Sequence, residues 1–335
     1  MKPGKLTIEE LKSIVFPYTG IRRPEVVVHA AIGEDCAVVD MDDRLLVVST
    51  DPITGAAKEN GYLGVHVSCN DVIASGGRPL GILVTLLMKE GSQAEDIRLI
   101  VEGIHTACLE LGIEIMGGHT EITQAVRENI LSFTAIGTKD RKYLEGQAPV
   151  APGDEIILTK GGAIEGSAIL YNDYPEYFRD KVSPDELRAG QEMIRHLSIA
   201  KEGILAMEHG AKVMHDVTEG GILGGVYEMA EAAGLGVLLE ESAIHFPPPA
   251  RALGRVFPEA NLLRLISSGS LLIAAPPGNK IREALKEAGI DSFLIGHFRE
   301  EGRTLVRMDG SREEIGEPES DELWTLLDQL KHTQR

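Results

Sequence analysis

Apolar runs typical of β-strands alternate with runs typical of α-helices along the whole chain, and the alternation is interrupted once, at GQAPVAPGDE (residues 146–155). Strands are expected at 25–30, 36–40, 44–50, 81–88, 113–116 and 129–137 before the interruption, and at 155–159, 212–215, 236–240, 269–275 and 291–298 after it. Chains of this kind pack helices onto sheets. The sequence therefore predicts a mixed α/β fold.

The interruption at 146–155 is also the best candidate for a domain boundary, because it holds two prolines, two glycines and little apolar content. With 335 residues, 43% of them hydrophobic, the chain is long enough for two cores. We therefore expect one α/β domain over 1–148 and a second over 149–308. Residues 309–335 are expected to form a polar link followed by an amphipathic helix at 320–331.

Capping patterns mark the starts of several helices. Thr7 and Glu10 predict a capping box for a helix over 8–16, and Ser92 and Glu95 predict the start of a helix over 93–111. Ser183–Pro184, with Glu186 three residues after the serine, predicts another helix start, with proline in the first turn. Helices are also expected over 221–233 and 279–289.

Charge and composition exclude several classes of function. The formal net charge of −19 argues against nucleic acid as a partner. We find no apolar run long enough to span a membrane. Cys36, Cys69 and Cys108 are far apart in apolar runs, as expected for reduced thiols of a cytoplasmic protein. There is no CxxC, HExxH or GxSxG motif, so the usual zinc and serine-hydrolase patterns are absent.

Asn70 and Asp71 lie in GVHVSCNDVIASGG (64–77), an otherwise apolar helical run. Leu63, Val67 and Ala74 share their face at helical spacing, and apolar residues occupy the opposite face too, so this helix is expected to be buried. A carboxylate in such a place is costly unless it meets a cation or hydrogen-bond donors. The sequence therefore predicts a specific partner for Asp71.

Three aspartates are candidate metal ligands. Asp35 in GEDCAVV and Asp51 in STDPI are expected at strand ends, and Asp71 lies on the buried helix. Mg²⁺ binds through one or two carboxylates together with substrate phosphates, and converging acidic groups would suit it. The alternative is that each aspartate caps a turn or a helix, which is the more common role of Asp35 or Asp51 taken alone.

Glycine-rich segments with polar neighbours are candidate ligand sites. GGHTE follows the strand at 113–116, and LTKGGAIEGS (158–167) joins a strand to a helix through exposed amides. HDVTEGG (215–221) carries Asp216 and Glu219, and SSGS (267–270) offers hydroxyls and amides. The alternatives are a structural histidine, tight strand–helix turns, and Thr218 acting as a helix cap.

Taken in order, GEDCAVV, STDPI, GVHVSCNDVIASGGRPLGILVTLLM, GGHTE, HDVTEGG and SSGSLL resemble one superfamily. It includes aminoimidazole ribonucleotide (AIR) synthetase (PurM), HypE-type hydrogenase-maturation proteins, thiamine-monophosphate kinase and selenophosphate synthetase. The layout is most similar to HypE-type and AIR-synthase-related proteins. The resemblance implies a PurM-like two-domain fold in which the N-terminal strands join those of a second copy to form a β-barrel. It also implies a homodimer that uses ATP and Mg²⁺ to phosphorylate an oxygen.

The resemblance also implies roles for individual residues. The metal ligands would be Asp35, Asp51, Asp71 and Glu121, and the catalytic residues would be Asp71 and Asp216. Nucleotide binding would fall to Asn70, Gly117, Gly118, His119, Thr120, Lys160, Gly161 and Gly162. One departure concerns His119, because many relatives have Asp at this position and AIR synthetases have Glu. A second is that HypE-type proteins end in a substrate-carrying cysteine, whereas the printed chain ends KHTQR.

The expectation is therefore an ATP- and Mg²⁺-dependent enzyme that activates a carbonyl, amide or acid oxygen by phosphorylation, in a hydrogenase or other metallocentre maturation pathway and with a maturation protein as a possible partner. Two alternatives remain. One is a nucleotide-binding assembly partner without catalysis, and the other is a small-molecule kinase similar to thiamine-monophosphate kinase.

Overall fold

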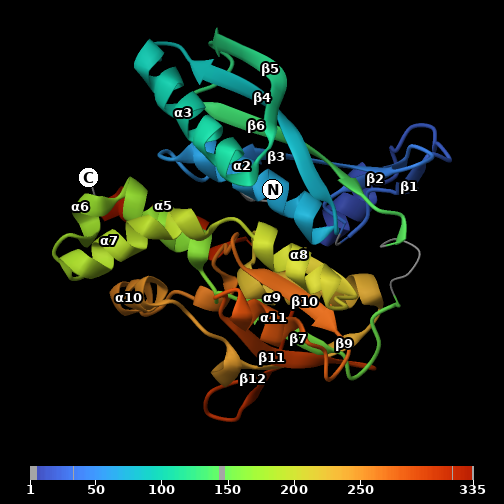
Figure 1. Cartoon of the computed structure of the whole chain (residues 1–335). Coiled ribbons are helices and arrows are strands. Elements are labelled where there is room, and N and C mark those ends of the chain that lie inside the picture. The colour runs from blue at the N-terminus through green and yellow to red at the C-terminus, as the bar shows by residue number, and fades with distance from the viewer. Residues whose placement is uncertain (1–5, 33, 143–147, 319, 334–335) are drawn as a thin grey trace. The chain divides into compact units, whose positions relative to one another are not determined.

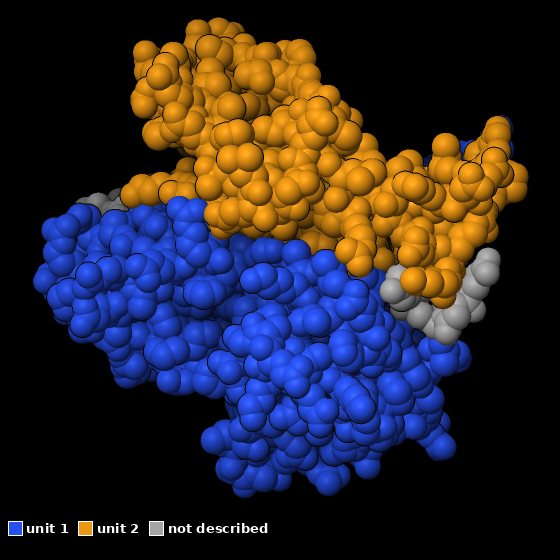
Figure 2. Space-filling view, viewed as in Figure 1, with its two compact units in different colours: residues 1–22, 30–33, 146–335 blue, residues 23–29, 34–145 orange. Residues whose placement is uncertain are grey.

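The computed structural model describes residues 6–32, 34–142, 148–318 and 320–333. The chain forms two compact units (Figure 2). Unit 1 comprises residues 1–22, 30–33 and 146–335, and unit 2 comprises residues 23–29 and 34–145. Residues 143–147, which overlap the boundary expected from the sequence, lie outside the described residues. The domain limits given above stay a prediction.

Within the described part of unit 2, six strands form one sheet in the order β1-β2-β3-β6-β4-β5. All neighbouring strands are antiparallel except β4 and β5, which are parallel. The strands are β1 (Val26–Val28), β2 (Ala37–Asp40), β3 (Leu45–Ile53), β4 (Arg78–Lys89), β5 (Glu114–Thr123) and β6 (Ile130–Lys139).

Two helices pack on this sheet, α2 (Asn60–Ala74) against β3 and β6, and α3 (Ala94–Leu111) against α2 (Figure 1). Residues 60–73 of α2 are all buried, which confirms the buried helix expected from the sequence. Gly64 permits the close packing, because a Cβ at this position would overlap the ring of Phe133 on β6. Asp71 is therefore held on a helix between the sheet and a second helix.

The described residues of unit 1 form a seven-stranded sheet in the order β13-β12-β9-β11-β7-β10-β8. Only the β12–β9 pair is parallel. The strands are β7 (Glu155–Thr159), β8 (Val213–Asp216), β9 (Gly236–Glu240), β10 (Leu271–Ala275), β11 (Ser292–Arg299), β12 (Arg303–Val306) and β13 (Arg312–Glu314).

Helices surround this second sheet, and α9 (Gly221–Ala233) contributes to its core through Ile222, Val226 and Met229. The first helix of the chain, α1 (Ile8–Glu10) with its continuation η1 (Leu11–Val15), also belongs to unit 1. The remaining helices are α5 (Ile164–Asp173), α6 (Pro175–Phe178), α7 (Pro184–Glu192), η2 (Met193–His196), α8 (Ala200–Glu208), η3 (Glu241–Ala243), α10 (Pro248–Val256), η4 (Leu262–Arg264), α11 (Ile281–Glu287) and α12 (Glu322–Thr333).

The ends of unit 1 are tied to its interior. The amide of Ile8 donates to Oε1 of Glu317 at 3.0 Å, and Lys12 Nζ lies 3.6 Å from Oε1 of Glu231 on α9. Helix α12 buries Leu323, Leu326, Leu327 and Leu330. The first and the last helix among the described residues therefore both pack within unit 1.

Most of the predicted helices and strands are confirmed, including the capping boxes at Thr7 and Ser183. The cap of α3 was predicted one residue too early. Gln93 and Asp96 form the box, because Ser92 instead lies 3.3 Å from Oδ1 of Asn129. The expected polar link at 309–319 contains β13, which completes the sheet edge. No helix in the described ranges is both long and apolar enough to cross a membrane.

Candidate active site

Asp71 has a hydrogen-bond donor, one of the two kinds of partner expected for a buried carboxylate. Ser49 on β3 donates a hydrogen bond from Oγ to Oδ2 of Asp71 at 2.5 Å, and the same Oγ lies 3.4 Å from Oδ2 of Asp51. Side chains two apart on a strand point to the same face, so Ser49 and Asp51 both face α2. Asp71 is only 5% exposed and Ser49 4%. The serine hydroxyl thus joins two of the three predicted aspartates.

Asp35 completes this group from the loop before β2. Its carboxylate is exposed, and one of its oxygens lies within 4.8 Å of a carboxylate oxygen of Asp71. The structure therefore brings Asp35, Asp51 and Asp71 together in unit 2. Three carboxylates at this spacing repel one another unless a cation neutralises them.

The donor set of this acidic group fits a hard divalent cation. Carboxylate oxygens are the ligands that Mg²⁺ prefers in proteins, and Mg²⁺ takes its remaining ligands from water and phosphate oxygens. Asp71 is fixed by Ser49 and by the packing of α2, whereas Asp35 is open to solvent. A buried anchor beside an open ligand is the arrangement that a metal–phosphate site requires.

The fourth predicted metal ligand, Glu121, is not part of this group. It lies on β5, and β6 and β4 separate β5 from β3. At about 4.8 Å per strand, β5 and β3 are roughly 14 Å apart. Oε2 of Glu121 instead lies 3.1 Å from Nε2 of His119, and both side chains are exposed.

The sequence suggested that Gly117 and Gly118 follow the end of a strand. In the structure they lie inside β5. They pair with Leu83 and Val84 of β4. A Cβ at Gly118 would overlap the Val84 carbonyl, and both glycines have positive φ angles, of 144° and 149°. The close approach of two strands explains Gly118, and the positive φ angle explains Gly117, without a phosphate. Thr120 belongs to the same exposed strand.

Asn70 precedes Asp71 on α2 and is fully buried. Because Asn70 is the neighbour of Asp71 on this buried helix, it lies close to the candidate site. This fits the position that the sequence gave to it, one residue from the buried aspartate.

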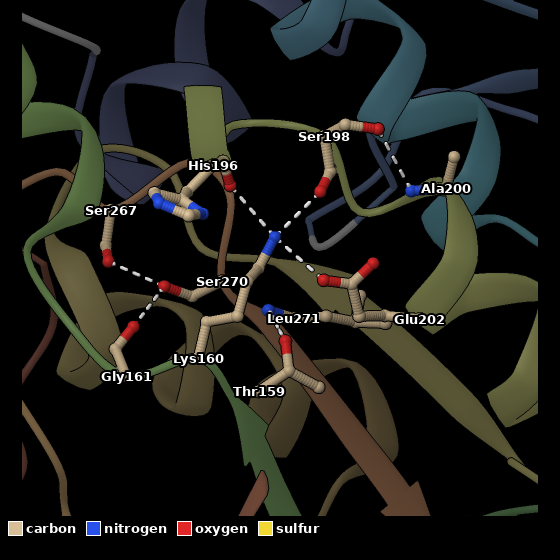
Figure 3. Close-up of polar contacts among 10 residues, drawn as sticks. All are labelled: Thr159, Lys160, Gly161, His196, Ser198, Ala200, Glu202, Ser267, Ser270 and Leu271. Atoms are coloured by element: carbon tan, nitrogen blue, oxygen red, sulfur yellow. Dashed lines mark hydrogen bonds and ion pairs between the residues drawn. The ribbon is translucent and has the colours of Figure 1, made fainter. Parts of the chain in front are cut away.

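Lys160, in unit 1, is turned into the protein (Figure 3). Its Nζ donates to the carbonyls of His196 at 2.9 Å and Ser198 at 2.7 Å, and forms an ion pair with Oε1 of Glu202 at 2.7 Å. Burial lowers the pKa of the Lys160 ammonium, and the ion pair with Glu202 opposes this effect. The ammonium is thus engaged by three protein acceptors among the described residues.

The backbone of the same loop is also engaged. The amides of Lys160, Gly161 and Gly162 donate to the carbonyls of Asp291, Thr159 and His245 at 2.8, 2.6 and 2.9 Å. These bonds argue against the triphosphate cradle that the sequence suggested for this loop.

Hydroxyl groups hold the loop at 160–162 against the segment before β10. Ser270 Oγ donates to the carbonyl of Gly161 at 2.5 Å and lies 2.8 Å from Ser267 Oγ, and the amide of Leu271 donates to Oγ1 of Thr159 at 3.0 Å (Figure 3). Of the two interpretations of SSGS, the structure supports the turn.

Asp216 ends β8 and is fully buried in unit 1. The neighbouring His215 contacts two oxygens: its Nδ1 lies 2.6 Å from the carbonyl of Asp216, and its Nε2 lies 2.9 Å from Oε2 of Glu228 on α9. The imidazole therefore links the end of β8 to α9 and fixes the backbone that carries Asp216.

Sequence reasoning missed three residues of these sites. Ser49 could have been found, because it lies two residues before Asp51 on a strand. Asp321 accepts hydrogen bonds from two glycine- and serine-rich loops of unit 1, and burial raises its pKa to about 6. Glu165, in the first turn of α5, is 4% exposed, and burial raises its pKa to about 7.

Comparison with known proteins identifies the family. The model of the AIR synthase related protein N-terminal domain matches residues 33–138, and that of the C-terminal domain matches residues 151–309. The chain therefore belongs to the AIR synthase-related proteins, which confirms the resemblance found in its motifs.

Among individual proteins, the chain is similar to carbamoyl dehydratase HypE of Cupriavidus necator, with 28% identity over 275 residues that cover 78% of this chain and 76% of that protein. It is also similar to the hydrogenase expression/formation protein HupE of Azotobacter chroococcum, with 26% identity over 83% of this chain and 82% of that protein.

Solved structures share the fold. HypE of E. coli superposes with a TM-score of 0.72 and 21% identity over 90% of this chain and 94% of that chain. A ThiL protein in complex with AMPPCP and TMP gives a TM-score of 0.67 with 19% identity, over 84% of this chain and 89% of that chain. The predicted PurM-like α/β fold is thereby confirmed, while the barrel shared with a second copy stays a prediction.

Proposed function

We propose that this chain is an ATP- and Mg²⁺-dependent enzyme of the HypE type, which activates a carbonyl, amide or acid oxygen by phosphorylation during hydrogenase maturation. Two relatives support this proposal by their names, a carbamoyl dehydratase and a hydrogenase expression/formation protein. A structural neighbour with a TM-score of 0.69 and 21% identity is a HypE in complex with ATP. The observation that carries the proposal is the group formed by Asp35, Asp51 and Asp71 around Ser49.

In this proposal Asp35, Asp51 and Asp71 hold the cation, which supplies positive charge to the phosphates of the nucleotide. Catalysis of phosphoryl transfer consists mainly of positioning and charge stabilisation. The chain contributes rigidity: Ser49 orients Asp71, and α2 is buried on nearly every side. Asn70 is kept as a nucleotide-binding residue because it precedes Asp71 on the same buried helix.

Other predicted ligands are not carried into the proposed site. Lys160, Gly161 and Gly162 are engaged by protein acceptors, and Glu121 lies roughly 14 Å from β3 along the sheet. Gly117, Gly118, His119 and Thr120 share that exposed strand. Asp216 is kept as a catalytic candidate because of its complete burial at the end of β8.

We further propose that the protein acts in the cytoplasm as a homodimer and works beside a maturation protein. Residues 114–122 of the edge strand β5 are exposed, and an uncovered edge can pair with another sheet. One solved neighbour is a HypE–HypF complex, with a TM-score of 0.68 and 19% identity. All three cysteines are buried and none forms a disulfide, as expected in a reducing compartment.

The test is calorimetric titration with ATP in the presence and absence of Mg²⁺. Asp71→Asn is expected to abolish Mg²⁺-dependent binding while the fold keeps or gains stability, because a mutually repelling carboxylate is removed. Asp43→Asn, at an exposed turn, serves as the control. Unchanged affinity in the Asp71 variant would remove this residue from the site.

Turnover measurements separate the proposed function from its alternatives. Phosphate release with a carbamoyl-type thiol substrate supports the dehydratase-type reaction. Tight ATP binding without turnover on any candidate substrate identifies an assembly partner instead. A phosphorylated small molecule formed without any protein partner identifies a kinase similar to the ThiL neighbour.

A further inference from the structure

Asp321 binds three separate segments of unit 1 through one carboxylate. Its Oδ2 accepts from the amide of Gly220 at 2.6 Å, and its Oδ1 accepts from the amides of Ile266 at 3.2 Å and Leu323 at 2.8 Å. The residue is 1% exposed. In the described part of the chain it has no Lys or Arg partner, so backbone N–H groups replace a counter-ion.

The three amides belong to segments with different tasks. Gly220 ends the HDVTEGG loop that carries Asp216 and Glu219, and Ile266 precedes the Ser267–Ser268 turn. Leu323 lies in the first turn of α12, where a carboxylate caps the helix and favours its dipole. One side chain from the C-terminal segment thus joins two motif-bearing loops to a helix.

The first loop makes a tight turn at its glycines, and the C-terminal segment packs against this turn. Gly220 and Gly221 have φ angles of 85° and 59°, in the left-handed region. A Cβ on Gly220 would lie 3.4 Å from Cβ of Pro318, so the C-terminal segment lies directly against this turn. The two loops also contact each other: the amide of Ser267 donates to the carbonyl of Val217 at 3.2 Å.

Burying a carboxylate costs free energy. The conformational order that its three hydrogen bonds impose on the chain is what Asp321 provides in exchange for this cost. A nearby acid, Glu219, adds to the cost, and Glu165 lies within electrostatic range of Asp321. Leu323, Leu326 and Leu330 anchor α12 by apolar contact and are 1–2% exposed, so Asp321 is not needed merely to hold the helix. Its specific effect is to fix the two loops relative to α12.

We propose that Asp321 is a positioning residue, which holds the Asp216 loop and the Ser267–Ser268 turn of unit 1 in register with α12 through its three hydrogen bonds. The assignment of these loops to the reaction rests on the proposed function. The ordering itself follows from the three hydrogen bonds and can be tested separately.

The first experiment is amide hydrogen exchange on the wild-type chain. Gly220, Ile266 and Leu323 are expected to exchange with similar protection, as members of one opening unit. Protection of Gly220 or Ile266 that is more than tenfold below that of Leu323 would overturn the proposal, whether or not the protein has the proposed activity.

The second experiment uses Asp321→Asn. The NH₂ group of the new side chain cannot accept a hydrogen bond, and in either orientation it faces at least one of the three backbone N–H groups, so at least one of the three bonds is lost. We expect protection in 216–221 and 265–269 to fall at least tenfold, and kcat for ATP-dependent turnover to fall at least tenfold with KM for ATP within threefold. Leu330→Ala, which removes a buried apolar contact of α12 but keeps the three hydrogen bonds of Asp321, is the matched control for lost stability. Fluorescence of Trp324, the single tryptophan, reports whether α12 stays docked in both variants.

The outcomes separate the two proposals. A wild-type chain without turnover contradicts the proposed function, and hydrogen exchange then decides the role of Asp321 alone. Wild-type turnover with an Asp321→Asn variant of unchanged kcat overturns the positioning role, as does an equal loss of kcat in Leu330→Ala. If Asp321→Asn does not fold, Asp321→Glu, which keeps the charge but moves it by one methylene group, is expected to give the same loss of loop protection.

Discussion

Oγ of Ser49 donates a hydrogen bond to Oδ2 of Asp71 at 2.5 Å, and this bond joins strand β3 to the buried helix α2. The bond gives the carboxylate its partner in the absence of a cation. It also fixes the side chain in one orientation, so the site is organised before a ligand binds.

Replacing Ser49 by alanine tests this organisation. A hydrogen bond to a charged group contributes about 2 kcal/mol, so Ser49→Ala should lower the free energy of unfolding by about that amount. The affinity for Mg²⁺·ATP should fall about fivefold, as measured by calorimetric titration. Thr50→Ala removes one part-buried and one exposed hydrogen bond on the opposite face of β3 and should leave the affinity unchanged.

The Lys160–Glu202 ion pair predicts a structural phenotype. Lys160→Met leaves the carboxylate of Glu202, which is 5% exposed, without its cation, and should cost about 3 kcal/mol or more in urea unfolding. The double variant Lys160→Met, Glu202→Leu should recover most of this loss. Affinity for ATP should stay within twofold in both, and a tenfold loss would return Lys160 to the nucleotide site.

Glu165 predicts a pH dependence of stability. Burial raises the pKa of Glu165 from 4.5 to about 7, so the folded state binds its proton more tightly than the unfolded state does. The contribution of protonated Glu165 to the free energy of unfolding is fully present below pH 4.5 and is lost as the pH rises through about 7. A shift of this size is worth about 3 kcal/mol between pH 4 and pH 8.

The measurement is the pH dependence of urea unfolding in the wild type and in Glu165→Gln. The variant, which stays neutral, should lack this loss of about 3 kcal/mol and should therefore be the more stable of the two at pH 8. Glu176→Gln, on an exposed helix, should keep the wild-type slope. Parallel curves for the wild type and Glu165→Gln would show that folding does not shift the pKa of this carboxyl group.

Gly118 predicts a large effect from a single methyl group. Gly118→Ala places a Cβ on the Val84 carbonyl and should destabilise unit 2 by about 3 kcal/mol or more by separating β5 from β4. Gly91→Ala is the control, because its φ of 90° is also unfavourable but nothing lies within 4 Å, and it should cost about 1 kcal/mol. Equal losses in thermal unfolding would contradict the close strand approach.

The exposed edge strand predicts association. Light scattering at micromolar concentration should give the mass of two chains, and Ile122→Lys on β5, where Ile122 is 56% exposed, should shift the protein towards monomers. Leu109→Lys, on the exposed side of α3, should leave the dimer intact. A wild-type monomer would exclude the shared barrel.

Local patterns in the sequence were enough to predict most helices, both confirmed capping boxes and the burial of α2. The grouping of Asp35, Asp51 and Asp71 was also accessible, because a carboxylate in an apolar helix demands a partner. Such signals work because their physical causes lie within one turn or one strand of the residue concerned.

Long-range packing explains what could not be predicted. Gly117 and Gly118 have the appearance of a strand-end loop until their pairing with β4 is known. The Lys160 loop resembles a phosphate cradle until the amides of Lys160 and Gly162 find acceptors that are far away in sequence, at Asp291 and His245. Asp321 bonds to residues 101 and 55 positions earlier, and nothing near it in the sequence indicates either contact.

Most of unit 2, residues 34–145, is an insertion within unit 1, since residues 1–22, 30–33 and 146–335 belong to unit 1. During synthesis the first helix therefore emerges about 300 residues before Glu317, to which Ile8 donates a hydrogen bond. Unit 2 can complete its sheet before the second part of unit 1 has been made. The α1 segment, by contrast, cannot form its contact with Glu317, and α12 cannot dock, until residues 317–333 have been translated. Asp321 is thus made 101 residues after Gly220, and its hydrogen bonds fix a loop that was synthesised long before it.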